Sequence, residues 1–205
     1  MDYVYAALFG ALGYLLGAIP FGVIIARSRG VDIFKFGSGN PGATNVKRAC
    51  GKTAGNLCFF LDALKGFLAV YIPKMLVWGG VIQIANIDAV CIVAFVAAII
   101  GHMFPAFTKF KGGKGVSVTI GGLIAFMWLA ILIGLVVWVV AFYGMRFVSV
   151  ASMLLAASLP FSTFLLYGHE SLRFYLALFI FVAVLFTHRS NISRLIAGTE
   201  HKFVK

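Results

Sequence analysis

Long apolar runs alternate with short polar segments along the whole chain. Five of these runs have the length of a single membrane-spanning helix, at residues 3–26, 54–78, 88–107, 148–167 and 172–187. A helix that crosses a bilayer needs about 20 mainly apolar residues, because the hydrocarbon core is about 30 Å thick. The pattern therefore predicts an all-α membrane protein.

A sixth run, at residues 116–143, is too long for one span and too short for two helices of normal length. Charge decides between the two options, because Lys and Arg concentrate in cytoplasmic loops. If the run crosses once, the basic tail beyond residue 188 lies opposite the other basic loops. If it crosses twice, as two short helices that turn near residues 127–130, the tail joins them. We therefore predict seven transmembrane helices, some of them short, with the N-terminus out and the C-terminus in.

Composition agrees with this picture. The chain is 62% hydrophobic and only 11% charged, whereas soluble proteins are about 45–50% apolar and about 25% charged. Seven spans in 205 residues leave little room for a soluble domain, so residues 1–205 are expected to form a single integral membrane domain. The net charge of +11 lies in short segments between apolar runs, which favours anionic lipid or substrate over nucleic acid.

A basic, glycine-rich turn separates two of the apolar runs at residues 110–117. Gly112, Gly113 and Gly115 allow the backbone to approach a ligand closely, and Lys111 and Lys114 add positive charge. Successive N–H groups in such a turn can point at one anion, which predicts a phosphate site. The alternative is that these lysines only set the topology. The turn does not match a nucleotide-binding P-loop, because Gly115 follows Lys114 where Ser or Thr is required.

Two further polar segments fall on the same predicted membrane face. Residues 37–45 are rich in Gly, Ser and Asn, and Arg48 follows them; this composition makes a turn with many hydrogen-bonding groups. His188 and Asn191 are three residues apart and share one side of a helix. Arg146, Ser149 and Ser152 stand where the chain re-enters the membrane between these segments.

One pair of charges lies inside a predicted span. Asp62 and Lys65 are three residues apart on one helical face. Charges at that depth are costly unless they are paired or face the protein interior. The pair is interpreted as a structural ion pair, with a substrate contact as the alternative. The three cysteines show no CxxC spacing, so neither a disulfide framework nor a zinc site is predicted.

With these segments in view, the chain resembles the bacterial acyl-phosphate:glycerol-3-phosphate acyltransferase family. The resemblance is carried by three motifs in family order, at residues 38–45, at residues 101–116 and at residues 188–200. It implies a seven-span fold with a cytoplasm-facing site that passes an acyl chain from acyl phosphate to the sn-1 hydroxyl of glycerol 3-phosphate, giving lysophosphatidic acid and inorganic phosphate.

The resemblance also implies site residues. Those expected to act in catalysis are Ser38, Lys114, His188 and Asn191. Those expected to bind substrate are Asn40, Asn45, Arg48, Lys111, Gly112, Gly113, Gly115, Ser149 and Ser152. No metal and no cofactor are expected. The expected partners are the two substrates, membrane lipid and a soluble enzyme that makes acyl phosphate, and the expected location is the bacterial inner membrane.

The base that takes the proton of the attacking hydroxyl is not evident in the sequence. Many acyltransferases use a His-x4-Asp pair, but Phe107 lies five residues after His102 and Ser193 five residues after His188. The resemblance implies that the substrate phosphate is the base, and an acyl-carrying Ser38 is the alternative. A transporter of a phosphorylated anion is the rival function. It would need polar residues through both halves of the membrane.

Overall fold

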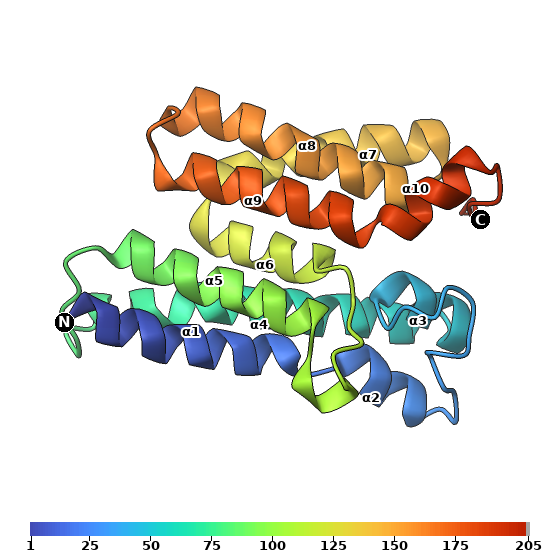
Figure 1. Ribbon diagram of the computed structural model, residues 1–205, viewed down its shortest axis with the longest axis horizontal. Helices are drawn as coiled ribbons and strands as arrows, with labels where there is room; N and C mark the ends of the chain where they lie inside the picture. Colours follow the sequence, from blue (N-terminus) through green and yellow to red (C-terminus); the bar gives the residue numbers. More distant parts are fainter. Residues whose placement is uncertain (204–205) are drawn as a thin grey trace. The chain divides into compact units, whose positions relative to one another are not determined.

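The structure is a computed structural model that describes residues 1–203. All regular elements in this part of the chain are helices (Figure 1). Five of them are long and apolar enough to cross a membrane, or six if a bent pair of helices counts as one span. The prediction of an all-α membrane protein is confirmed. The count of seven spans and the orientation of the termini remain predictions.

The chain divides into two compact units, which are described separately. Unit 1 covers Met1–Phe126, and unit 2 begins at Met127. The helices of unit 1 are α1 (Asp2–Ala18), α2 (Phe21–Arg27), α3 (Ala43–Cys50), α4 (Lys52–Trp78), α5 (Ile87–Met103), the short 3-10 helix η1 (Ala106–Thr108) and α6 (Val116–Phe126). Those of unit 2 are α7 (Trp128–Met145), α8 (Val148–Tyr167), α9 (Leu172–Thr187) and α10 (Arg189–Ile196).

The first apolar run is broken, although the sequence analysis treated it as continuous. Helix α1 ends at Ala18, Ile19 has an extended backbone, and α2 begins after Pro20. A residue that precedes proline is disfavoured in the helical region, and proline donates no backbone N–H, so a helix readily ends there. The break removes the usual helical partner of the Ile19 carbonyl, which accepts instead from the N–H of Phe21 at 3.1 Å and has room for a second donor. Lys65 supplies one, as described below.

The long run at residues 116–143 is also divided, as predicted, and the division falls at Met127. The expectation of two short helices is right for α6, which has 11 residues, and wrong for α7, which has 18. Helix α7 is longer because it continues beyond the apolar run to Met145. Arg146, the residue after its end, has a left-handed φ of 64°.

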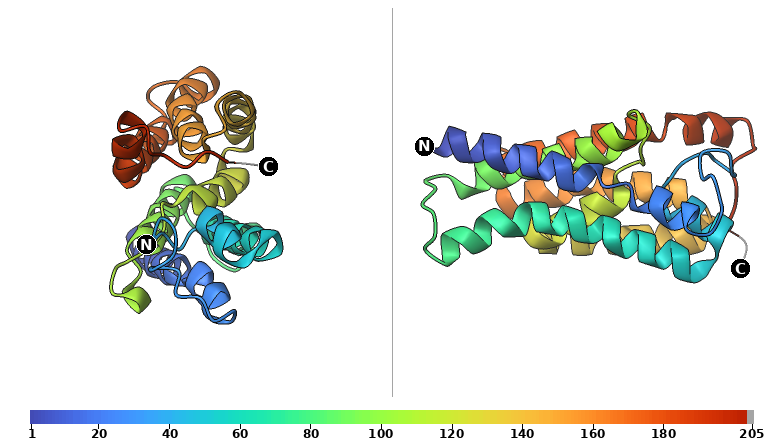
Figure 2. Two further views of the ribbon diagram at one scale, coloured as in Figure 1. Left: turned by 90° about the vertical axis from the view of Figure 1, so that its right-hand side faces the viewer. Right: turned by 90° about the horizontal axis from the view of Figure 1, so that it is seen from below.

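Close helix packing in unit 1 depends on small residues. Helix α1 packs against α5, and α4 packs against α6. A Cβ atom at Gly17 would collide with the carbonyl of Ala98, and one at Gly121 with the carbonyl of Ala63. Glycine at these positions lets the helix backbones touch, as is common between membrane helices. In unit 2, α8 packs against both α7 and α9 (Figure 2).

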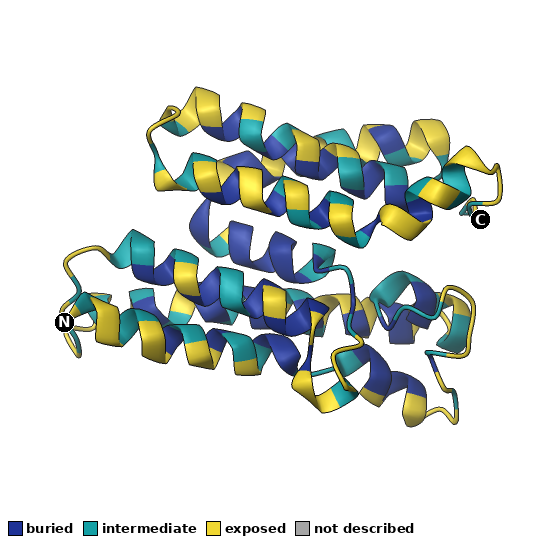
Figure 3. Ribbon diagram, in the orientation of Figure 1, coloured by how far each residue is buried: buried dark blue, intermediate teal, exposed yellow. Residues whose placement is uncertain are grey.

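Both units expose many large apolar side chains along their long helices, while small residues and aliphatic side chains fill the contacts between helices (Figure 3). This distribution fits helices whose outer faces contact lipid acyl chains. In unit 1, α2, α3, η1 and the turn before α6 lie at one end, and the loop between α4 and α5 lies at the other (Figures 1 and 2). The two polar motifs of unit 1 therefore lie at the same end.

Candidate functional site

The first motif loop is shaped by Asn45, whose side chain is almost fully buried at 2% exposure in the first turn of α3. Its Nδ2 donates to the carbonyls of Ile33 and Phe36 at 3.4 and 2.9 Å, and its Oδ1 accepts from the backbone N–H of Ser38 at 3.3 Å. These bonds use both hydrogens of the amide nitrogen. We therefore assign Asn45 to holding the loop in place.

The rest of this loop presents exposed groups. Asn40 Oδ1 accepts from the N–H of Gly42 at 2.9 Å, forming a turn directly before α3. Ser38 and Arg48 are both exposed, on the loop and in the last turn of α3. The end of α3 is held by Arg29, whose guanidinium donates to the carbonyl of Cys50 at 2.7 Å. Ser38 and Arg48 thus belong to one small framework and are accessible to a ligand.

The glycine-rich turn connects η1 to the start of α6. Thr108 Oγ1 donates to the carbonyl of Lys111 at 2.7 Å, and the N–H of Gly113 donates to the carbonyl of His102 at 3.0 Å. Gly115 has a φ of 81°, a conformation that favours glycine, and its carbonyl accepts the first hydrogen bond of α6, from Thr119, at 2.8 Å. Lys114 therefore lies at the N-terminal end of a helix, where the helix dipole also attracts anions.

A cluster of buried ionisable side chains lies next to this turn. It consists of Asp62 and Lys65 on α4 and His102 on α5, and we call it the Asp62 cluster. Lys65 Nζ lies 2.9 Å from Asp62 Oδ1, and His102 Nδ1 lies 3.7 Å from the same oxygen. The geometry at Asp62 Oδ1 is that of an ion pair and not of an aligned hydrogen bond. The predicted pairing of Asp62 with Lys65 is confirmed, and its role as a structural pair stays a prediction, because both residues border a pocket.

The Asp62 cluster borders a small pocket within unit 1. Other residues that line the pocket come from the α1–α2 break, the first motif and the glycine-rich turn: Ile19, Pro20, Pro41, Lys111, Gly112 and Gly113. Sequence reasoning did not foresee the proximity of His102 to Asp62, because the two residues are far apart in the chain. It also left the role of His102 open.

The third motif, in unit 2, surrounds a sharp bend. His188 lies between α9 and α10, which are inclined at 56° to each other. Its ring is buried, and Nδ1 lies 2.8 Å from the carbonyl of Val184. A carbonyl only accepts hydrogen bonds, so Nδ1 carries a proton and donates it to Val184.

Glu200 gathers the remaining residues of the third motif. Its Oε1 accepts from Ser149 Oγ at 2.8 Å and from Asn191 Nδ2 at 2.6 Å, while Oε2 pairs with Arg194 Nε at 2.7 Å. Partial burial on its own would raise the pKa of Glu200, but the three hydrogen bonds and the charge of Arg194 outweigh burial and lower it. Glu200 is therefore an ionised hub at neutral pH.

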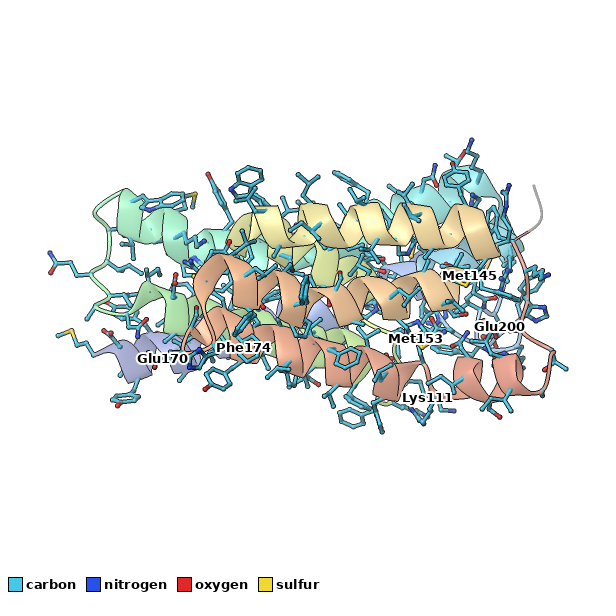
Figure 4. All side chains as sticks on the ribbon, turned by 90° about the horizontal axis from the view of Figure 1, so that it is seen from above. Lys111, Met145, Met153, Glu170, Phe174 and Glu200 are labelled. Carbon is cyan, nitrogen blue, oxygen red and sulfur yellow. The ribbon has the colours of Figure 1, made fainter. Side chains whose placement is uncertain are left out.

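Figure 4 shows Glu200 and Met145 at one end of unit 2 and Glu170 and Phe174 at the other. Ser152 lies one turn after Ser149 on α8 and is buried, and its Oγ accepts from Trp138 Nε1 at 3.3 Å. Ser149, Ser152 and Asn191 are all engaged by protein groups in this structure. Sequence reasoning noted Glu200 only as part of a motif and missed that it organises the others.

The expected site residues therefore form two clusters, one in each unit. Unit 1 contains Ser38, Asn40, Asn45, Arg48, Lys111, Gly112, Gly113, Lys114 and Gly115. Unit 2 contains Ser149, Ser152, His188 and Asn191. Their convergence on a single pocket remains a prediction. Within residues 1–203, no group of three or more His, Cys, Asp or Glu side chains is arranged to hold a metal ion.

Comparison with known proteins gives one consistent family. The family profile described as "Glycerol-3-phosphate acyltransferase" matches residues 7–198. The glycerol-3-phosphate acyltransferase of Aquifex aeolicus is 41% identical over 191 residues, which covers 93% of this chain and 95% of that protein. The corresponding protein of Wolbachia pipientis wMel is 40% identical over 195 residues and covers 95% of this chain and 96% of its own length.

Two solved structures of PlsY (YgiH), an integral membrane glycerol 3-phosphate acyltransferase, are also similar. Its glycerol 3-phosphate form gives a TM-score of 0.86 at 38% identity, covering 97% of this chain and 96% of that chain. Its lysophosphatidic acid form gives a TM-score of 0.83 at the same identity, covering 97% and 95%. The motif resemblance, the family profile and these relatives agree: the chain belongs to the glycerol-3-phosphate acyltransferase family of integral membrane proteins.

Proposed function

We propose that this protein transfers a fatty acyl group from acyl phosphate to the sn-1 hydroxyl of glycerol 3-phosphate. The hydroxyl oxygen forms a bond to the acyl carbon, the bond between that carbon and the phosphate oxygen breaks, and the products are lysophosphatidic acid and inorganic phosphate. Family membership supports the acyltransferase activity. Structures of a relative in glycerol 3-phosphate and lysophosphatidic acid forms support this acceptor and this product.

The observation that carries the proposal is the placement of cationic groups at one end of unit 1. Exposed Ser38 and Arg48 lie at the same end as the glycine-rich turn, where Lys114 stands at the N-terminal end of α6. Both proposed substrates carry a phosphate group, and both would be attracted by Arg, Lys and backbone N–H groups. We assign Arg48, Lys111 and Lys114 to holding phosphate.

The proposed reaction does not require the protein to activate the leaving group. Acyl phosphate already carries a good leaving group, so the main tasks are to position the hydroxyl and to stabilise the negative charge that develops. The proton of the hydroxyl passes to a phosphate oxygen of the substrate in this proposal, with Lys114 and His188 orienting and stabilising that phosphate. Ser38 contributes its hydroxyl as a hydrogen-bonding group.

We further propose that the active site faces the cytoplasm from the inner membrane of a bacterium. The acyl tail would reach the pocket from the lipid. A soluble enzyme that makes acyl phosphate would then supply this donor on the same side of the membrane.

The deciding experiment is an assay of inorganic phosphate release by the purified, detergent-solubilised protein. Release from acyl phosphate that depends on glycerol 3-phosphate, with lysophosphatidic acid formed in equal amount, is the expected result. Transport of glycerol 3-phosphate into proteoliposomes without any acyl transfer would instead identify a transporter. Release from acyl phosphate without an acceptor would identify a hydrolase.

A further inference from the structure

The Asp62 cluster contacts three segments that the proposed function needs. Lys65 Nζ donates to the carbonyl of Ile19, in the α1–α2 break, at 2.8 Å. The backbone carbonyl of His102 accepts from the N–H of Gly113, in the glycine-rich turn, at 3.0 Å. Cys58, one turn before Asp62, lies 3.6 Å from Asp62 Oδ2 and 3.9 Å from the carbonyl of Pro41, in the first motif.

The glycine-rich turn lies directly on the imidazole of His102. A Cβ atom at Gly113 would collide with His102 Nε2, and one at Gly112 would collide with the carbonyls of His102 and Met103. The ring is also buried, with 8% of the residue exposed. Its Nδ1 faces Asp62 and its Nε2 faces the turn, so neither nitrogen is open to a substrate. A role for His102 as a general base is therefore not supported by this geometry.

The same geometry is suited to holding the glycine-rich turn in place. Asp62 fixes the edge of the ring that carries Nδ1, and Lys65 neutralises Asp62 while it holds the helix break. The opposite edge of the ring and the adjacent carbonyl then determine where Gly113 sits. Buried ion pairs such as Asp62–Lys65 can hold neighbouring segments in place, because paired charges in a low-dielectric interior have few alternative arrangements.

We propose that the Asp62 cluster is a positioning device for the glycine-rich turn, with His102 as the residue in direct contact with it. The cluster sets the position and orientation of Gly112 and Gly113, and thereby the direction in which the N–H of Gly112 and the side chain of Lys114 face a phosphate. The activity readout of this inference rests on the proposed function. The positioning itself does not.

The test uses the contact between His102 and Gly113 in full-length protein. Gly113→Ala places a methyl group where the ring lies, and His102→Ala removes the ring. We expect each single variant to raise KM for at least one of the two phosphate-bearing substrates about tenfold, with a smaller change in kcat. The double variant His102→Ala/Gly113→Ala should perform at least about threefold better than the product of the single effects, because contacting residues are not additive.

A second readout does not need activity. Hydrogen exchange of the backbone amides at residues 110–115 should accelerate in His102→Ala, because the ring that supports the turn is lost and the hydrogen bond from Gly113 weakens. His102→Gln, which keeps a polar side chain, should show a smaller acceleration. If His102→Ala does not fold, His102→Gln replaces it in both measurements.

Two matched controls are available in unit 2. Gly144 has no atom within 4 Å of an added Cβ, and His169 has a side chain that is 71% exposed. Gly144→Ala and His169→Ala should leave KM and exchange at residues 110–115 unchanged. Unchanged KM and exchange in His102→Ala, or strictly multiplicative effects in the double variant, would overturn the inference. An inactive wild type would overturn the proposed function alone, because the exchange measurement would still decide the role of His102.

Discussion

At the scale of single residues, the cations that are paired inside the protein differ in role from those that are exposed. Lys65 is buried within the membrane part of α4, and its ammonium group serves an ion pair and a backbone carbonyl at once. Arg194 is paired with Glu200, while Arg48 and Lys111 are exposed. Lys65 and Arg194 are paired within the protein and hold its parts together, whereas we assign the exposed Arg48 and Lys111 to phosphate.

Lys114 provides the first prediction. Lys114→Ala should lower kcat/KM about 100-fold or more, because it removes a cation that we place against transition-state charge, a loss typically worth about 2.7–4 kcal/mol. Lys114→Arg should retain part of the activity. The measurement is phosphate release by purified protein with a matched thermal unfolding curve. Lys35→Ala is the control, because its side chain is 86% exposed. Near-normal activity of Lys114→Ala would count against a phosphate role.

Glu200 provides a prediction about pH. Unfolded chains protonate Glu near its ordinary pKa of 4.5, whereas the folded pKa is lower. The stabilisation from Glu200 is therefore complete above pH 4.5 and is lost as the pH falls from 4.5 through the folded value. Thermal unfolding should show this loss in the wild type and a much smaller pH dependence in Glu200→Gln. Glu170→Gln is the control, because that side chain is 92% exposed, and it should follow the wild type.

Contacts within one helix can be predicted from the sequence, whereas contacts between distant segments cannot. The Asp62–Lys65 pair follows from helical spacing. The contacts of His102 with Asp62 and of Ser149 with Glu200 join residues that lie far apart in the chain, and they depend on how helices pack. Hydropathy carries no information about such packing. Motif resemblance pointed to Glu200 without showing what it binds.

At the scale of elements, the fold depends on helices that stop inside the apolar region. The break after α1 could have been read from Pro20, and the division at residues 116–143 was inferred from charge on distant loops. In both cases a lysine of α4 meets the broken end. Lys65 reaches the carbonyl of Ile19, and Lys74 reaches the carbonyl of Ala125, at the end of α6, at 2.9 Å.

The contact between Lys74 and the end of α6 can be tested directly. Its ammonium group also lies 4.9 Å from the centre of the Phe126 ring. Lys74→Met should destabilise unit 1 by about 1.5–3 kcal/mol, the usual contribution of a hydrogen bond to a charged group, and should lower the thermal unfolding midpoint in detergent. Lys35→Met should have no measurable effect. Equal midpoints for Lys74→Met and the wild type would show that the end of α6 does not need the cation.

At the scale of the whole molecule, apolar run lengths predict the positions of the long helices, and the observed helices coincide with most of the predicted runs. The run at residues 148–167 is α8, and the run at residues 172–187 is α9. The number of crossings and their direction require more than helix lengths, because α6 is too short to be recognised as a span by itself. They depend on the rule that basic loops stay inside.

Reporter fusions can test the predicted topology. Alkaline phosphatase, which is active only outside the cytoplasm, should be active when fused after residue 83, between α4 and α5. A fluorescent protein that matures only in the cytoplasm should fluoresce when fused after residue 205. The reverse pattern at the C-terminal fusion would contradict seven spans with the N-terminus out.

The short length of α6 has a consequence for biosynthesis. The eleven residues of α6 rise only about 16 Å, roughly half of the hydrocarbon core. A helix of this length partitions only weakly into lipid by itself. The partner that completes it, Lys74, belongs to a helix translated earlier. We therefore expect insertion of this short helix to depend on α4, which is already in the bilayer when α6 is synthesised.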